Sequence, residues 1–246
     1  MKLKILAATV FCALLCNGAN ADAITGDLSR INSSVQSQIR DNVSLDINTQ
    51  YLVKTATLSV LYNSTYFDDC ITEAIANKVP VLMLRESLMQ GAPYVGISST
   101  QTALERLSKV ITELKLREET PSSSTVNQDT RFNSGLDIQK FLFGDAITTM
   151  HQNAQNNEKL ITVDMLTAYC FGDFYTRSDL SLKERELLTF VYITALGAHQ
   201  SQLQAHIQAN LKVGNSKDIL IDTLKVMTPY LGFPRTLTAL DLVKKA

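Results

Sequence analysis

The sequence predicts an all-α protein built from two tandem helical units. Apolar residues recur at spacings of three and four rather than two, as they do along 187–195, and this is the spacing of a helix that buries one face. The second observation is an internal similarity, because Pro93–Gly96 (PYVG) is repeated as Pro229–Gly232 (PYLG) at an offset of 136 residues. A repeat of this kind indicates two units that share one architecture.

The first element is a predicted signal peptide over residues 1–21. Two lysines precede an apolar run, Ile5–Cys16, and small residues follow it up to Ala21, which is the order found in secretory signals. A lipoprotein signal is the alternative, since Cys16 ends the run, but Leu15 before it is bulkier than a lipid-attachment site prefers. The run is shorter than the roughly 20 residues that cross a bilayer. We therefore expect no membrane span and a periplasmic or secreted protein.

The first unit is expected over residues 22–116 as a degenerate copy of the repeat. Helical spacing runs through Ser33–Arg40 and Thr102–Leu116. Pro80 is expected in the first turn of a helix, where proline is tolerated. Pro93 falls inside a helical pattern and is expected to bend or break it.

A linker is expected over residues 117–140, because most of this stretch is polar, rich in Ser and Thr and poor in apolar residues. The second unit then covers 141–246 and starts with an additional helical pair in Phe141–Tyr175. Farther on, Gly214 is expected to end one helix, and Pro229 to bend the next as Pro93 does in the first unit.

Composition excludes some classes of function. The formal net charge is −1 with scattered basic residues, so we expect no nucleic-acid partner. Cleavage near Ala21 would leave two cysteines, Cys70 and Cys170. One disulfide bridge is possible in an oxidising compartment, but two separate buried thiols are the favoured interpretation.

Glu186 and His206 are the candidate catalytic residues. Glu186 interrupts a stripe of Leu and Val, and His206 falls on the following amphipathic segment, so the two side chains can meet in the core and transfer protons. The alternative is a structural role, with Glu186 paired to a cation. The equivalent positions of the first unit are Tyr51 and Cys70, so only the second unit keeps the pair. His199, seven residues before His206, is a further catalytic candidate if the helix is continuous.

Arg235 is the candidate substrate-binding residue, because a guanidinium can hold a carboxylate in a bidentate fork; a surface salt bridge is the other interpretation. His199 and His206 lack the four-residue spacing usual for zinc ligands on one helix, so we expect no metal. There is no phosphate loop, nucleophile elbow or CxxC motif. We therefore expect no cofactor and neither serine hydrolase nor dithiol chemistry.

Three blocks of the second unit, RELLTF, ALGAHQSQLQAHIQANLKVGN and PYLGFPRTLTAL, resemble the carboxymuconolactone decarboxylase family, which includes the alkylhydroperoxidase D-like proteins. The resemblance is close over Leu166–Lys245 and fainter over Leu45–Val110. It implies helical units assembled into trimers or hexamers, so a tandem chain would form a homotrimer of paired units. It also implies a proton relay at Glu186 and His206, whereas the thiol positions of the peroxidase branch hold no cysteine.

Three functions follow from these observations. The first is acid/base chemistry on a small organic acid or lactone by Glu186 and His206, as in the decarboxylase branch, which needs no cysteine. The second is a peroxiredoxin-type activity that uses Cys170, alone or with Cys70, in an unusual way. The third is a binding or assembly module without catalysis.

Overall fold

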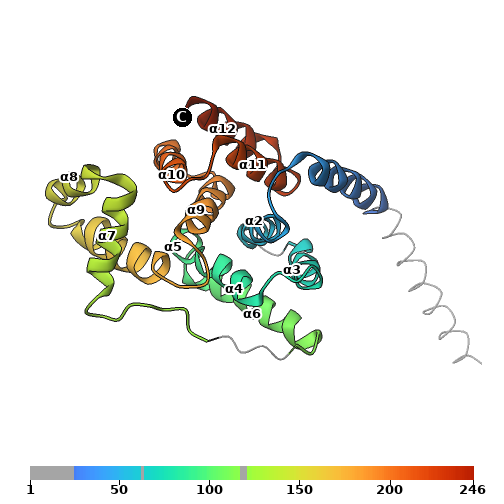
Figure 1. Cartoon of the computed structure of the whole chain (residues 1–246), viewed down its shortest axis with the longest axis horizontal. Helices are drawn as coiled ribbons and strands as arrows, with labels where there is room; N and C mark the ends of the chain where they lie inside the picture. Colours follow the sequence, from blue (N-terminus) through green and yellow to red (C-terminus); the bar gives the residue numbers. More distant parts are fainter. Residues whose placement is uncertain (1–24, 62–63, 117–120) are drawn as a thin grey trace, which may run out of the picture. The chain divides into compact units, whose positions relative to one another are not determined.

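The computed structural model describes residues 25–61, 64–116 and 121–246, and every regular element within these ranges is helical (Figure 1). The predicted all-α fold is confirmed. The expected signal peptide, 1–21, lies outside the described residues. In the part of the chain that is described, no helix combines the length and apolar character needed to cross a membrane.

The chain divides into two compact units, one of which ends at Val43 and contains a helix over 25–42, while the other is Ser44–Ala246 and contains the remaining helices. The helices of the larger unit are α2 (Ile47–Val60), α3 (Tyr66–Ala76), α4 (Val81–Met89), α5 (Ala92–Val95), α6 (Ile97–Glu113), α7 (Arg131–Phe143), α8 (Asp145–Asn153), the π-helix η1 (Leu160–Tyr175), α9 (Leu182–Leu196), α10 (Gln200–Lys212), α11 (Lys217–Leu231) and α12 (Phe233–Lys245).

The helices from α2 to α6 and from α9 to α12 follow one another in the same order, with the equivalent starts displaced by 134 to 136 residues. The backbone between them also matches. Gly96 has φ 84° and ψ 158°, and its counterpart Gly232 has φ 77° and ψ 168°. Lys78 (φ 65°) and Gly214 (φ 91°), also 136 residues apart, both adopt positive φ. The helix order and these backbone conformations therefore recur at the offset of the internal sequence similarity.

The two expected proline bends differ. Pro229 lies inside a continuous α11, whereas α4 ends at Met89 and Pro93 lies in the first turn of the separate helix α5. Gly91, at the break, packs directly against Tyr192. A Cβ atom on Gly91 would lie 2.6 Å from Cζ of that ring, so only glycine allows the approach.

Helix α7 begins at Arg131, inside the stretch 117–140 that we expected to be a linker. The N-terminal half of this helix is polar and contains Gly135, so its sequence resembles that of a loop. The structure explains the glycine: α7 and η1 cross closely where Gly135 faces Gly172, and a Cβ on either residue would overlap the backbone of the other helix.

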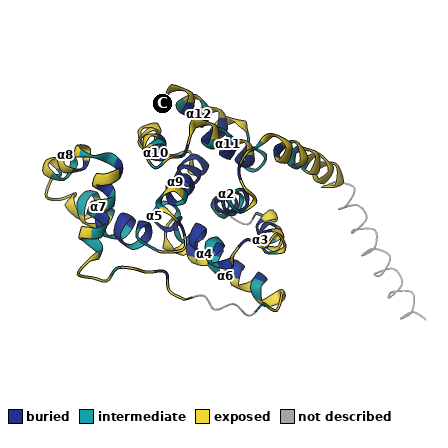
Figure 2. Ribbon diagram, viewed as in Figure 1, coloured by how far each residue is buried: buried dark blue, intermediate teal, exposed yellow. Residues whose placement is uncertain are grey.

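Helix α9 lies at the centre of the larger unit, beside α2, α5 and α10. Every side chain from Arg185 to Ala195 is buried (Figure 2). The core of the unit therefore forms around α9, and the buried charged residues of this helix, Arg185 and Glu186, must find partners inside the protein.

Candidate active site

The start of α9 is fixed by a capping box. The Ser181 hydroxyl accepts a hydrogen bond from the Glu184 amide at 3.3 Å, and the Glu184 carboxylate accepts one from the Ser181 amide at 2.6 Å. This reciprocal arrangement satisfies two free amides of the first turn. It sets the register in which Glu186, in the next turn, points into the core.

The structure brings Glu186 and His206 together, as expected. The Nδ1 atom of His206 on α10 lies 2.9 Å from Oε2 of Glu186 on α9. Glu186 is fully buried, and 12 % of the His206 side chain is exposed. Because Nδ1 faces the carboxylate, Nε2 of His206 is left for proton exchange. The other carboxylate oxygen, Oε1, has no hydrogen-bond partner among the described residues.

Two asparagines hold α10 against α9 beside this pair. The Asn210 amide donates to the backbone carbonyls of Glu186 at 2.9 Å and of His206 at 2.8 Å. Asn215 donates to the Asn210 side chain and to the Lys183 carbonyl. The sequence analysis missed both residues, because an asparagine near a helix end reads as an ordinary cap or turn residue.

Aromatic rings form one wall of the site. The Phe143 ring packs edge-on against the His206 ring, with centroids 5.3 Å apart, and also contacts Phe171. Phe171 in turn stacks on Tyr175 at 4.6 Å. These rings come from α7 and η1, and they limit the access of water to the histidine.

Hydroxyl groups cluster around Thr189, one turn after Glu186 on α9. Its hydroxyl lies 2.6 Å from the Tyr175 hydroxyl and 3.1 Å from that of Tyr94, and the two tyrosine hydroxyls are 3.2 Å apart. Burial and then the charge of Glu186 raise the pKa of Tyr175 well above its usual value; for Tyr94 the causes are burial, Cys170 and Glu186. Both tyrosines therefore stay protonated and can donate hydrogen bonds.

Both described cysteines are free and buried. Burial raises the pKa of the Cys170 thiol to about 12 and that of Cys70 to about 11. Because the thiolate is the reactive form, neither environment favours peroxide reduction near neutral pH. Cys70 lies 3.8 Å from the Thr55 hydroxyl.

The other two predicted site residues lie elsewhere. His199 is exposed and precedes α10 as its N-cap residue, so it does not share a helical face with His206. Its Nδ1 lies 3.3 Å from the Ser201 hydroxyl. Arg235 is exposed and donates to the Ala195 carbonyl at the end of α9. Within the described part of the chain, neither side chain forms a hydrogen bond or an ion pair with Glu186 or His206.

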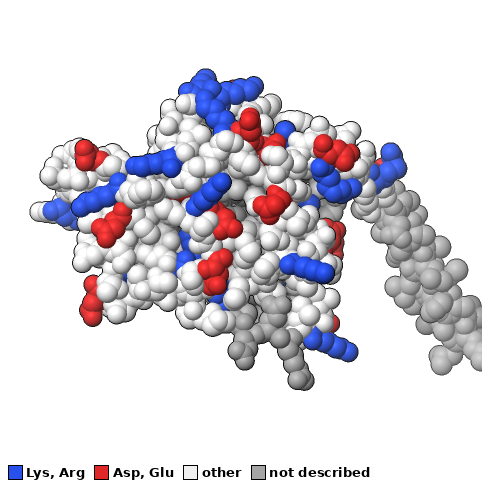
Figure 3. All heavy atoms as spheres, in the orientation of Figure 1, with Lys and Arg blue, Asp and Glu red and all other residues white. Residues whose placement is uncertain are grey.

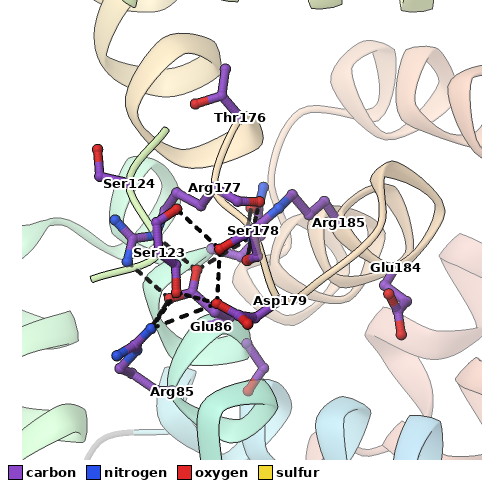
Figure 4. Close-up of polar contacts among 12 residues, drawn as sticks. Arg85, Glu86, Ser123, Ser124, Thr176, Arg177, Ser178, Asp179, Glu184 and Arg185 are labelled. Atoms are coloured by element: carbon purple, nitrogen blue, oxygen red, sulfur yellow. Dashed lines mark hydrogen bonds and ion pairs between the residues drawn. The ribbon is translucent and has the colours of Figure 1, made fainter. Parts of the chain in front are cut away.

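A buried ionic cluster joins the two halves of the unit (Figure 4). The fully buried carboxylate of Glu86 on α4 accepts from Arg177 at 2.7 and 2.8 Å and from the fully buried Arg185 at 3.2 Å. Burial alone would raise the pKa of Glu86, but the hydrogen bonds and charges of these arginines hold it below its usual range. Arg185 also donates to Gln90 at 3.0 Å, and Gln90 donates to Thr189 at 3.2 Å, so the cluster is linked to the hydroxyls beside Glu186.

Sequence comparison agrees with this architecture. Residues 162–245, which span most of η1 and all of α9 to α12, match the family model described as Carboxymuconolactone decarboxylase family. The 4-carboxymuconolactone decarboxylase of Acinetobacter baylyi (strain ATCC 33305 / BD413 / ADP1) is 22% identical over 120 residues, which cover 49% of this chain and 89% of that protein. Residues 162–245 therefore match the carboxymuconolactone decarboxylase family, as the sequence motifs predicted.

Proposed function

We propose that the protein performs acid/base catalysis on a small organic acid or lactone, with Glu186 and His206 as the catalytic pair. The observation that carries the proposal is the 2.9 Å contact between His206 Nδ1 and a fully buried carboxylate. The family match over residues 162–245 and the Acinetobacter relative support a carboxymuconolactone decarboxylase-like function in general terms. The proposed substrate class follows from the Acinetobacter relative, a 4-carboxymuconolactone decarboxylase.

In the proposed reaction, the bond between the substrate carboxylate and its ring carbon breaks. Carbon dioxide leaves, and the electron pair passes into the unsaturated lactone. Protonated His206 then delivers a proton to carbon from Nε2, and solvent returns a proton to the imidazole. Glu186 orients the ring and stabilises the imidazolium form. The hydroxyls of Tyr94 and Tyr175 stabilise the negative charge that develops when the bond breaks.

In the same proposal, the first half of the larger unit, α2 to α6, is a copy that no longer catalyses the reaction. Tyr51 and Cys70 stand where Glu186 and His206 stand in the second half, and the Tyr51 hydroxyl accepts a hydrogen bond from Asn77 at 3.0 Å. Tyr94, however, comes from the first half and joins the hydroxyls near Glu186. The degenerate copy therefore contributes a side chain to the site of the other copy.

We also propose that residues 1–21 direct the chain to the periplasm or the exterior, and that three chains assemble into a trimer of paired units. Mass spectrometry of the N-terminus of the exported chain tests the first proposal. Light scattering tests the second, and a monomer at micromolar concentration would contradict it.

Decarboxylation of 4-carboxymuconolactone, with other small lactone acids in parallel, is the test of function. The wild-type chain is expected to release carbon dioxide, and His206→Gln is expected to lower the rate by about 10²- to 10⁴-fold, the usual contribution of a positioned acid/base. If the folded wild type releases carbon dioxide from none of these acids, the acid/base proposal fails for this class and a binding module becomes the better account.

A further inference from the structure

A cavity of about 400 Å³ opens where α9 ends and α10 begins, with the first turns of α12 on its other side. The residues that line it are Ile193, Thr194, Leu196, Gly197, Ala198, Gln200, Leu203, Pro234, Arg235 and Thr238. Five of them carry apolar side chains, and Thr194, Gln200, Arg235 and Thr238 carry polar or charged ones. The cavity therefore combines apolar and polar side chains with one cation, Arg235.

The charge of Arg235 is not matched by a carboxylate. Its guanidinium donates to the Ala195 carbonyl, and no acidic group among the described residues lies within ion-pair distance of it. Thr194 also lines the cavity; its side chain is buried, and its hydroxyl has no hydrogen-bond partner in the described part of the chain. The cavity lining therefore contains hydrogen-bond donors but no negatively charged side chain.

A counterpart cavity in the first half provides an internal comparison. It measures about 140 Å³, and most of its lining residues occupy positions equivalent to those of the larger cavity at offsets of 135 or 136. The equivalent pairs are Leu58 and Ile193, Ser59 and Thr194, Leu61 and Leu196, Phe67 and Leu203, Ser98 and Pro234, Ser99 and Arg235, and Thr102 and Thr238.

The arginine of the smaller cavity is already neutralised. Arg106 donates to the Asp68 carboxylate at 2.8 Å and to the Ser64 carbonyl at 3.1 Å, and its guanidinium lies 4.6 Å from the centre of the Phe67 ring. The position equivalent to Arg235 is Ser99, which carries no charge. One fold therefore presents two related cavities that differ in size and in available positive charge.

We propose that the larger cavity binds a small monocarboxylate with an apolar body, held by the guanidinium of Arg235. A guanidinium fork matches the two oxygens of a carboxylate, and Leu196, Leu203 and Pro234 cover the apolar part. The volume falls within the usual range for small-molecule sites. The positive end of α10 also lies here, because Gln200 starts that helix and its N-cap residue makes no side-chain capping bond.

Neither Glu186 nor His206 lines this cavity, although Leu203, three residues before His206 on α10, does. The inference goes beyond the proposed reaction, since binding here requires no chemistry at Glu186. It also predicts that the two sites respond to different substitutions.

Benzoate is a suitable probe, and benzamide is its neutral analogue. Titration calorimetry of the full chain is expected to give one benzoate per chain, with binding at least about tenfold weaker for benzamide and for Arg235→Gln, because charge-assisted hydrogen bonds are lost. Arg106→Gln and His206→Gln are the matched controls and are expected to bind benzoate as the wild type does. If Arg235→Gln does not fold, Arg235→Lys, which keeps the charge but not the fork, is expected to show weaker binding.

Three results would overturn the proposal. The first is that the wild type does not bind benzoate at millimolar concentration. The second is that the folded Arg235 variants bind benzoate as well as the wild type does. The third is that His206→Gln loses benzoate binding to the same extent as the Arg235 variants. The last result would assign benzoate to the Glu186–His206 pair, and the proposed reaction would remain to be judged by its own assay.

Discussion

His206 Nδ1 lies 2.9 Å from Oε2 of the fully buried Glu186, whose second oxygen has no partner among the described residues. The side-chain amide of Asn210 donates hydrogen bonds to the backbone carbonyls of both Glu186 and His206. A buried carboxylate that is only half satisfied is costly to a fold. Such a cost is common where a group is kept ready for a ligand or a reaction.

Replacing Tyr94 by Phe is expected to lower kcat about tenfold and to leave KM nearly unchanged, if its hydroxyl acts when charge develops near Glu186. The matched control is Tyr192→Phe. The Tyr192 ring stacks on that of Tyr94, and its hydroxyl donates to the Ser87 carbonyl. The control is expected to lose stability but not activity. Equal loss of kcat in the two variants would mean that the Tyr94 hydroxyl acts only through packing.

The Glu86 cluster predicts a specific dependence of stability on pH. The folded-state pKa of Glu86 lies below its unfolded value of about 4.3, so its stabilisation is present above that pH and is lost as pH falls through the folded pKa. Glu86→Gln is expected to destabilise the protein by about 3–5 kcal/mol at pH 7, because Arg85, Arg177 and Arg185 lose a buried partner. The free energy of unfolding of this variant is also expected to fall less steeply in acid than that of the wild type.

Urea denaturation at pH 7 and in acid measures the free energy of unfolding of the variant and of the wild type. The control is Glu113→Gln, which removes an exposed pair with Lys109. It is expected to leave the free energy of unfolding unchanged at both pH values. A Glu86→Gln protein as stable as the wild type at pH 7 would show that the cluster contributes nothing to the fold.

Cys170 is expected to resist peroxide and alkylating reagents in the folded protein. Burial raises the pKa of its thiol to about 12, so almost no thiolate forms at pH 7. Mass spectrometric mapping of Cys70 and Cys170 after peroxide treatment is expected to find both thiols intact, whereas alkylation in urea labels both. Rapid oxidation of Cys170 in the folded chain would revive the peroxidase function.

Substitutions at the equivalent positions Lys78 and Gly214 are expected to change the free energy of unfolding in opposite directions. Lys78 has φ 65° and Gly214 has φ 91°, a region that costs a side-chain-bearing residue about 1 kcal/mol. Lys78→Gly is therefore expected to raise the free energy of unfolding, and Gly214→Ala to lower it, each by about 1 kcal/mol. Stability changes of the same sign in the two variants would contradict the assigned backbone conformations.

The sequence was sufficient for the helical fold, because apolar spacing reports which face each helix buries. It was also sufficient for Glu186 and His206, since a carboxylate within an apolar stripe requires an internal partner. It failed for His199, because α10 starts at Gln200 and the assumed continuous helix does not exist.

Contacts between the halves were beyond sequence reasoning. Glu86 meets Arg177 and Arg185 more than 90 residues away, and a charged residue on an amphipathic helix ordinarily indicates a solvent-exposed face. The same holds for Tyr94, whose part in the site depends on how α5 packs against α9 and η1. Only tertiary packing determines these pairings.

Rates of Glu186→Gln, His206→Gln and the double variant, measured on a lactone acid that the wild type decarboxylates, test the central claim most directly. If the two residues act as one proton-transfer pair, the double variant is expected to be no slower than the slower single variant, because either change disables the pair. Losses that multiply in the double variant, or single variants as active as the wild type, would contradict the account.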